Sequence, residues 1–276
     1  MASRRLALAA LAALLLIAGG CGVQAAGRIP PVPAASALAR IRAAGVLRVA
    51  IREDAPPMGF RRPGSLVPEG FEIDFARALA ASLLGDPNRV AWVPAGPVRF
   101  LALDAHAADV VVAGVAATPG AAGPYSFSPP YYRSPVVLIA RRSTALTGLR
   151  SLDGRVVATL PEDGGAGALL VAAARAQGVT VRLTAEPSAE VAAAAVQGGE
   201  ATAMVTTRAL APAWLLADPQ LRMWRPGVGD VAYVVAMRAD EPDLVRQVDA
   251  AVRDLVGGPT WRAMLRKWGL PIPSTS

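Results

Sequence analysis

The stretch at residues 109–132, DVVVAGVAATPGAAGPYSFSPPYY, most constrains how this chain folds. It opens with a β-branched apolar run, which predicts a short buried parallel strand ending before Gly114. A small-residue turn containing Thr118 follows, and then a cluster of prolines and tyrosines at residues 129–132. Because proline fixes φ and has no backbone N–H, no regular element is expected to continue through this cluster. A second apolar strand starts at Pro135, so the stretch predicts a crossover between two bodies.

A second crossover is predicted at residues 231–237, another apolar run. Between the two crossovers, short apolar strands alternate with alanine-rich helices, which is typical of a parallel βα sheet. The crossovers divide the chain into lobe 1, residues 44–132 plus 231–276, and lobe 2, residues 133–230. We therefore expect an α/β fold of two lobes, each with a mixed, mostly parallel sheet, joined by a two-strand hinge.

The N-terminus has the pattern of a secretory signal peptide over residues 1–20, with two arginines, an apolar run and two glycines before Cys21. The apolar run is too short to span a bilayer as a stop-transfer helix. Cys21 is the only cysteine of the chain, and its place directly after the glycines indicates lipidation. Residues 21–43 are then a lipidated N-terminus, a tether and a short helix, with the protein anchored outside the cytoplasmic membrane. The alternative is an ordinary signal peptide with an incidental cysteine.

Charge and composition exclude several classes of function. The formal net charge is +7, but the arginines are scattered, aromatic residues make up 5% and no basic run of five appears. We therefore expect a solvated basic surface and no nucleic-acid partner. The sequence has a single histidine, His106, in a predicted turn, and no Gly-Lys-Ser/Thr loop, so neither a metal site nor a cofactor is expected.

Short motifs in a fixed order carry a resemblance to a known family. The first motif is the predicted strand before Gly114, then Gly114 itself, Thr118-Pro119 and Phe-Ser-x-Pro-Tyr-Tyr at residues 127–132. The others are Gly-Phe-Glu-Ile-Asp at residues 70–74, where a helix is expected to begin, the segment RFLALDAHAAD at residues 99–109, and Lys267-Trp268 near the end. Over residues 46–268 the chain resembles extracellular solute-binding proteins of the amino-acid type, family 3, the receptors of ABC importers. The resemblance implies a periplasmic-binding-protein-like fold of type II. In the entry motif, Asp74 is assigned to capping the helix that follows.

Ligands of open α/β sheets bind beyond the carboxyl ends of the strands. This rule selects the loops that follow Ile51, Val93, Ala113, Thr159 and Thr206. We expect the binding cleft to lie there, between the lobes.

The resemblance also implies how the family holds a zwitterion, and this chain departs from that pattern. The arginine for the α-carboxylate falls at Ala121, the aspartate for the ammonium at Thr207, and aromatic residues at Gly96 and Ala55. A threonine of the family falls at Ala116. We therefore expect a roomier, more apolar pocket with weak or no binding of ordinary amino acids.

The polar groups left at the predicted cleft are our candidate ligand-binding residues. They are Arg52, Glu53, Asp54, Thr118, Asp163, Thr206 and Thr207, with the backbone N–H groups of Gly114 and Gly164. Arg52 has two interpretations: it binds an anion of the ligand, or it pairs with Glu53 or Asp54. Asp163 either binds the ligand or caps the helix that begins at Ala166.

The function implied by the resemblance is capture of a small polar solute, an amino acid or a derivative, for delivery to an ABC permease and its ATPase. This requires ligand-dependent closure but no catalysis, and we expect a monomer and not an enzyme. One alternative is a sensor or assembly protein with a degenerate pocket. Another is an enzyme similar to cyclohexadienyl dehydratases, with Glu53, Asp54, Glu162 or Asp163 as the acid.

Lipidation of Cys21 is testable on the mature protein. We expect mass spectrometry of the membrane-extracted protein to show an N-terminus at Cys21 carrying a diacyl modification, and Cys21→Ala to release the protein from the membrane fraction. Cleavage at another residue, or an unmodified Cys21, would contradict the anchor.

Overall fold

The computed structural model describes residues 36–96, 98–116, 123–160 and 165–273. The predicted signal peptide and Cys21 lie outside the described residues, as do Thr118, Ala121, Asp163 and Gly164. No helix of the described ranges is long and apolar enough to cross a membrane.

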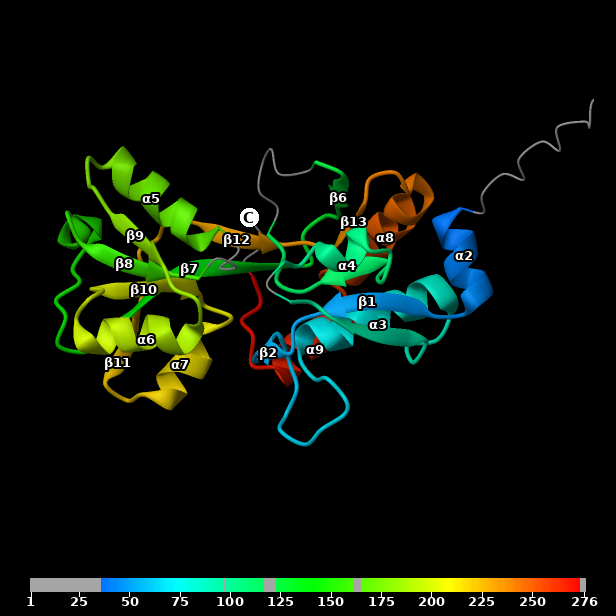
Figure 1. The fold of residues 1–276 in the computed structure, drawn as a ribbon, viewed down its shortest axis with the longest axis horizontal. Coiled ribbons are helices and arrows are strands. Elements are labelled where there is room, and N and C mark those ends of the chain that lie inside the picture. The colour runs from blue at the N-terminus through cyan, green and yellow to red at the C-terminus, as the bar shows by residue number, and fades with distance from the viewer. Residues whose placement is uncertain (1–35, 97, 117–122, 161–164, 274–276) are drawn as a thin grey trace, which may run out of the picture. The chain divides into compact units, whose positions relative to one another are not determined.

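Helices and strands alternate along most of the described chain (Figure 1). In chain order they are α2 (Ala37–Ala44), β1 (Leu47–Ile51), β2 (Asp54–Ala55), β3 (Gly59–Phe60), α3 (Phe71–Leu84), β4 (Val90–Pro94), α4 (Leu101–Asp104), β5 (Val110–Val112), β6 (Tyr125–Phe127), β7 (Tyr132–Arg141), the 3-10 helix η1 (Leu149–Leu152), β8 (Val156–Thr159), α5 (Ala166–Ala176), β9 (Arg182–Ala185), α6 (Ala189–Gly198), β10 (Ala203–Thr207), α7 (Ala211–Ala217), β11 (Leu221–Trp224), β12 (Asp230–Tyr233), β13 (Ala236–Arg238), α8 (Pro242–Leu255) and α9 (Pro259–Lys267).

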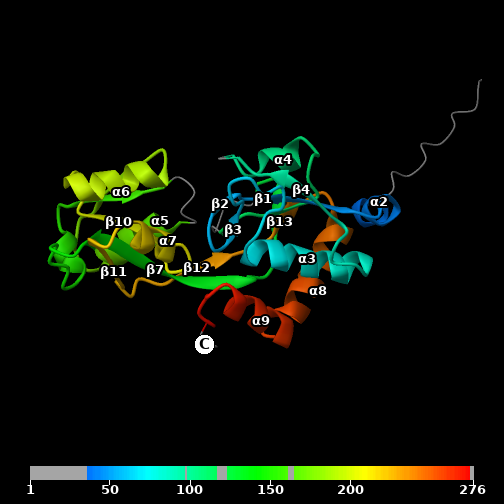
Figure 2. The same ribbon diagram turned by 90° about the horizontal axis from the view of Figure 1, so that it is seen from below.

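The first sheet has the strand order β4-β1-β5-β13-β6. Strand β1 runs parallel to β4 and β5, whereas β13 runs antiparallel to β5 and β6. Alternate residues of β1 face opposite sides, as the period of a strand requires. Val49 packs in the cluster that includes Phe75 of α3 and Val248 of α8, and Ala50 packs with Leu103 of α4. Helices α3, α8 and α9 lie together on one side of this sheet (Figure 2).

The second sheet has the order β11-β7-β10-β8-β9, with β12 paired to β7. Strands β10, β8 and β9 are parallel, and β7 runs antiparallel to β10, β11 and β12. Leu138 faces the cluster that contains Leu170 of α5, and its neighbour Ile139 faces the cluster that contains Val196 of α6. Helix α5 therefore covers one face, and α6 with α7 covers the other (Figure 1).

The chain passes between the two sheets twice, in neighbouring strands. Strand β7 begins at Tyr132, just after the first sheet's β6, and β12 leads within a few residues into β13 of the first sheet. The two strands pair antiparallel, with Tyr132 opposite Tyr233. The predicted fold class, two α/β lobes with mixed sheets joined by two strands, is confirmed. The exact lobe bounds stay a prediction.

An aromatic cluster packs where the two crossing strands leave the first sheet. The rings of Phe75 and Tyr131 are stacked with centroids 4.7 Å apart, and those of Tyr132 and Tyr233 lie 6.3 Å apart and nearly parallel. Phe71 contacts both Tyr131 and Tyr132. All five side chains are buried. Of the proline and tyrosine cluster through which we expected no regular element, Tyr132 is thus the first residue of β7, and both tyrosines fill the core.

Several local predictions are confirmed by hydrogen bonds. The Ser36 side chain caps α2 by accepting from Ala39 N, and Gly45 ends that helix in the left-handed conformation. The Ser188 side chain caps α6 by accepting from Val191 N. The two serine hydroxyls accept hydrogen bonds from otherwise unpaired N–H groups at the helix starts, and the glycine adopts the positive φ that ends a helix. The residue type alone predicts both roles.

The expected role of Asp74 was wrong. Helix α3 begins at Phe71, so Asp74 is already inside the helix. Its Oδ2 accepts hydrogen bonds from Lys267 Nζ at 2.7 Å and Trp268 Nε1 at 2.8 Å. Asp74 therefore ties α3 to the end of α9, a contact between residues almost two hundred positions apart that no local pattern reveals.

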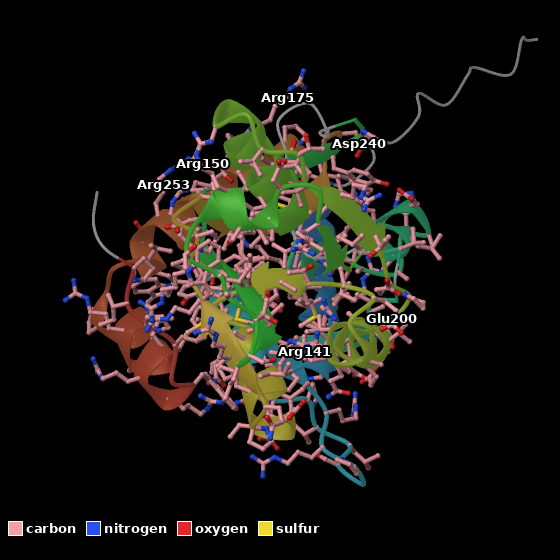
Figure 3. All side chains as sticks on the ribbon, turned by 90° about the vertical axis from the view of Figure 1, so that its left-hand side faces the viewer. Arg141, Arg150, Arg175, Glu200, Asp240 and Arg253 are labelled. Carbon is pink, nitrogen blue, oxygen red and sulfur yellow. The ribbon has the colours of Figure 1, made fainter. Side chains whose placement is uncertain are left out.

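The exposed basic side chains are dispersed over the molecule. Arg141 of β7, Arg150 of η1, Arg175 of α5 and Arg253 of α8 project outward from four different elements (Figure 3). Such spacing is typical of a solvated surface.

A buried ion pair joins α8 to the first sheet. Arg238 Nη2 donates to both carboxylate oxygens of Glu241 at 3.0 and 2.9 Å, and its Nη1 donates to the carbonyls of Leu103 and Ala108. Arg40 of α2 donates to the same carboxylate at 2.6 Å. Arg238 and Glu241 are both 7% exposed, so the pair between them is buried, whereas the Arg40 side chain that joins it from α2 is 53% exposed.

We expect Glu241→Ala to lower the free energy of unfolding by about 3–5 kcal/mol, because it leaves a buried guanidinium without its counter-charge. Arg62→Ala is the control: it breaks the exposed pair with Glu69 and is expected to cost about 0–1 kcal/mol. Urea unfolding of both variants measures the difference. Equal destabilisation would contradict the importance of the buried network.

Candidate functional site

Loops from both sheets line one cavity of about 400 Å³. From the first sheet's side come residues that follow β1, and from the second come residues that follow β8 and β10 and the start of α6. The lining residues are Arg52, Asp54, Ala55, Pro56, Leu160, Pro187, Ser188, Ala189, Glu190, Thr206, Leu210, Ala213 and Trp214. The rule that ligands bind beyond the carboxyl ends of strands therefore locates a real cavity.

A second, much smaller cavity of about 10 Å³ shares part of this lining. It is lined by Arg52, Ala55, Met58, Glu72, Gly114, Leu210 and Tyr233. Since Arg52, Ala55 and Leu210 line both cavities, the small one is an inner extension of the same cleft.

Glu72 lies at this inner end and is fully buried. Its Oε1 accepts a hydrogen bond from Gly114 N at 2.7 Å and another from the Tyr131 hydroxyl. The side chain thus joins the first turn of α3 to the loop after β5 and to the start of the first crossing. Burial raises the pKa of the Glu72 carboxyl, outweighing the hydrogen bonds that favour its charged form.

Arg52 is held by its neighbour in the loop. Its Nε donates to Asp54 Oδ1 at 2.8 Å and its Nη2 to Asp54 Oδ2 at 3.0 Å, a bidentate pair. Burial by itself would raise the pKa of Asp54, but the hydrogen bond and charge of Arg52 bring it below its usual value. Of the two interpretations of Arg52, the pair with Asp54 is present, and both side chains line the larger cavity.

The other candidate from this loop, Glu53, is directed elsewhere. It forms an ion pair with Arg61, and it lines neither of the two cavities described above. Its sequence neighbours Arg52 and Asp54 do line the larger cavity. Position in the loop alone therefore does not tell which of the three side chains faces the cavity.

The two threonines at the end of β10 differ in the same way. Thr206 lines the larger cavity, whereas the Thr207 hydroxyl is hydrogen-bonded to the Tyr233 hydroxyl at 2.8 Å and is fully buried. Thr207 therefore serves the contact between β10 and β12, and adds no charge to the cleft.

Gly114 contributes its backbone in a way that the sequence did not show. Its N–H donates to Glu72, and its carbonyl accepts from Arg99 Nη1 at 2.6 Å. Its φ of 64° is a left-handed conformation that glycine adopts without strain. Both backbone groups of Gly114 are thus engaged by lobe 1 side chains.

Three small residues stand where the resemblance implies larger side chains. Ala55 lies in β2, is buried and lines both cavities, and the space that a Cβ at Gly96 would occupy has no described neighbour within 4 Å. Ala116 forms an isolated β-bridge with Tyr233. At Ala55, the lobe 1 side of the cleft therefore presents a methyl group rather than an aromatic ring.

Sequence reasoning missed Glu72, Tyr233 and the two apolar residues Leu210 and Trp214. A helical signal existed for Glu72, since Ala76 and Leu79 follow at i+4 and i+7 and are buried on the same face. Trp214 belongs to α7, a helix that we did not predict and that begins with Ala211-Pro212. The sequence placed Tyr233 in the second crossing strand. That its side chain lines the inner cavity depends on how this strand pairs with β7.

The fold and the cleft define a class: proteins with two α/β lobes, joined by two strands, that have a small-molecule cavity between loops of both sheets. Comparison with known sequences agrees. The model for bacterial extracellular solute-binding proteins, family 3, matches residues 47–271. The chain therefore belongs to the bacterial extracellular solute-binding proteins of family 3.

Individual relatives are distant but similar along their length. The ABC transporter glutamine-binding protein GlnH of Bacillus subtilis is 22% identical over 265 residues, covering 95% of each chain. A solute receptor for L-cysteine of Neisseria gonorrhoeae superimposes with a TM-score of 0.71 at 22% identity, covering 86% of this chain and 95% of that one. The ancestral amino acid-binding protein AncCDT-1, a precursor of cyclohexadienyl dehydratase, gives a TM-score of 0.68 at 24% identity and covers 85% and 99%.

The raised pKa of Glu72 predicts a pH dependence of stability. Unfolded glutamate has a pKa near 4.5, so above that pH the folded protein retains a proton that the unfolded chain has released. The contribution of Glu72 to the stability of the wild type therefore falls as pH rises from 4.5 through the raised pKa of the folded state. The charged and titratable groups around Glu72 are Tyr131, Tyr233, Arg99 and Arg52.

We expect the free energy of unfolding of Glu72→Gln, relative to wild type, to increase as pH rises above 4.5, because glutamine does not titrate. Denaturant unfolding of both proteins at a series of pH values measures this. Burial also raises the pKa of Asp249, but this residue is present in both proteins, so its contribution cancels in the difference between them. A difference that stays constant with pH would contradict the shift.

Proposed function

We infer that this protein is the substrate-binding component of an ABC importer, which captures a small polar solute between its lobes and delivers it to a permease and ATPase. The observation that carries the proposal is the cavity of about 400 Å³ whose lining comes from loops of both sheets. A ligand that contacts both lobes stabilises the closed arrangement by its differential affinity, which is what a receptor of this kind requires.

The cleft offers contacts of several kinds to a solute. Asp54 and Glu190 provide carboxylates, Arg52 a guanidinium, Ser188 and Thr206 hydroxyl groups. Leu210 and Trp214 provide an apolar surface on the lobe 2 side. Such a mixture of apolar walls and few polar groups suits a small amino acid derivative.

The proposal excludes tight binding of a plain amino acid. Ala121 stands at the position where the family's carboxylate-binding arginine is expected, and Thr207 is neutral and engaged with Tyr233. A charged hydrogen bond contributes about 1.5–3 kcal/mol, so loss of such contacts reduces affinity by orders of magnitude.

The cell location follows from the family and from the N-terminus. We propose that the protein works outside the cytoplasmic membrane as a monomer, anchored by a lipid on Cys21. The signal pattern of residues 1–20 and the position of the single cysteine support this anchor.

A dehydratase-like activity has less support. Asp54 is bound to Arg52, and Glu53 to Arg61, so neither is placed as a free acid. Glu162 and Asp163 lie outside the described residues. A sensor with a degenerate pocket would need a filled cleft, whereas the described residues leave about 400 Å³ open.

We expect native mass spectrometry of the protein as purified to reveal a co-purifying solute, and addition of that solute to reduce the radius of gyration in X-ray scattering. Calorimetry with the twenty amino acids should give no micromolar binding. Leu210→Trp, which fills both cavities, should abolish solute binding, whereas Leu216→Trp on the exposed side of α7 should not.

The outcomes separate the alternatives. Micromolar binding of a plain amino acid would contradict the divergent pocket but keep the receptor. If no solute co-purifies and no candidate solute changes the scattering profile, the receptor itself is contradicted.

A further inference from the structure

The two carboxylate oxygens of Glu72 have different surroundings. Oε1 accepts from the Tyr131 hydroxyl and from Gly114 N, which accounts for the structural role of the side chain. Oε2 is buried and has no hydrogen-bond partner among the described residues. The contacts that hold the fold together thus use only one of the two oxygens.

An unpartnered carboxylate oxygen is costly inside a protein. Burial removes the water that would otherwise donate to it, and a buried polar atom left unsatisfied costs about 1–3 kcal/mol, more when it is charged. Native structures contain few such atoms, and each requires an explanation. The N-terminal turn of α3 favours a negative charge at this position but supplies no donor to Oε2.

The space beside Glu72 has the size of a single polar group. The inner cavity measures about 10 Å³, which is on the order of one water-sized group. The polar side chains around it already have partners: Arg52 is paired with Asp54, and the Tyr233 hydroxyl with Thr207. Gly59 also lies near: a Cβ there would lie 2.8 Å from the Arg52 carbonyl oxygen and 3.5 Å from Oε2, so the close packing leaves no room for a side chain beside this oxygen.

Charged groups of both signs lie at this place: the guanidinium groups of Arg99 and Arg52 act on the Glu72 carboxyl, and carboxylates line the connected larger cavity. Asp54 and Glu190 line the larger cavity, one from each lobe, and the guanidinium of Arg52 is committed to Asp54. A carboxylate only accepts hydrogen bonds, and its strongest partner is a cationic N–H donor.

We propose that Glu72 Oε2 binds the cationic nitrogen of the solute, which makes Glu72 a ligand-binding residue and a primary amine the class of ligand that the cleft takes. This inference rests on the proposed function as a solute receptor. The ammonium group enters the inner cavity, and the remainder of the molecule occupies the larger cavity against Leu210 and Trp214.

The experiment compares amines with alcohols of the same shape on the full mature protein. The probes are 1,4-diaminobutane against 1,4-butanediol, and ethylamine against ethanol, followed by calorimetry and by ligand-observed NMR. We expect each amine to bind the wild type more tightly than its matched alcohol.

Glu72→Gln is the informative variant, because its amide oxygen keeps the bonds from Tyr131 and Gly114 while an N–H₂ donor replaces Oε2. We expect this variant to lose about tenfold to a hundredfold in affinity for the amines. Asp249→Asn is the matched control: it makes the same change at another partly buried carboxylate with an unpartnered oxygen, on α8 and outside the cleft lining. It should leave amine affinity unchanged.

Each outcome decides the inference. Amines that bind no better than alcohols, or equal amine affinity in wild type and Glu72→Gln, would overturn it. Should Glu72→Gln fail to fold, the comparison of amines with alcohols on the wild type decides alone. If a different, co-purifying solute binds and Leu210→Trp blocks it, this inference fails while the receptor stands; if no solute of any kind binds, both fail.

Discussion

The hydrogen bonds of one buried carboxylate hold together the parts of lobe 1 that meet at the cleft. Glu72 connects the start of α3, the glycine that ends β5 and the tyrosine that precedes the first crossing. Around it, Phe71, Phe75 and the tyrosines of both crossings form a continuous aromatic layer. Because the carboxylate is fully buried, its partners are not readily exchanged for water, and α3 thereby holds Gly114 in place. The same arrangement places Glu72 at the inner end of the cleft.

The cleft of this protein keeps the general plan of a two-lobed receptor with an altered set of contacts. Its lining comes from loops beyond the strands of both sheets, with carboxylates on both sides and apolar residues of α7 on one. Arg52, the cation in the loop after β1, is engaged by Asp54. The Thr207 hydroxyl is hydrogen-bonded to the Tyr233 hydroxyl in a buried contact. We assign an amine to the inner end because Glu72, which lines it, has a buried carboxylate oxygen without a hydrogen-bond partner among the described residues.

Local patterns predicted the elements well where one signal dominated. Apolar runs located the core strands, Ser36 and Ser188 the helix starts, and Gly45 a helix end. Patterns failed where a residue's partner is remote in sequence. Asp74 looked like a cap but binds Lys267 and Trp268 of the terminal helix region. For Glu53, whose ligand-binding role stays a prediction, the local pattern did not reveal the ion pair with Arg61. The prolines and tyrosines at 129–132 marked the crossing correctly, yet the burial of Tyr131 and Tyr132 in the core follows from packing against α3.

The sequence by itself determined the two-lobed α/β class and predicted loops that line the larger cavity, because strand periodicity, turn residues and motif order are local properties of the chain. The tertiary structure alone decided which polar side chains reach the cleft. Neighbouring residues such as Glu53 and Asp54, or Thr206 and Thr207, point in different directions, and only the pairing of distant strands and helices gives each its surroundings. The unpartnered oxygen of Glu72 is such a property: it arises from burial between three segments, and burial depends on packing rather than on sequence spacing.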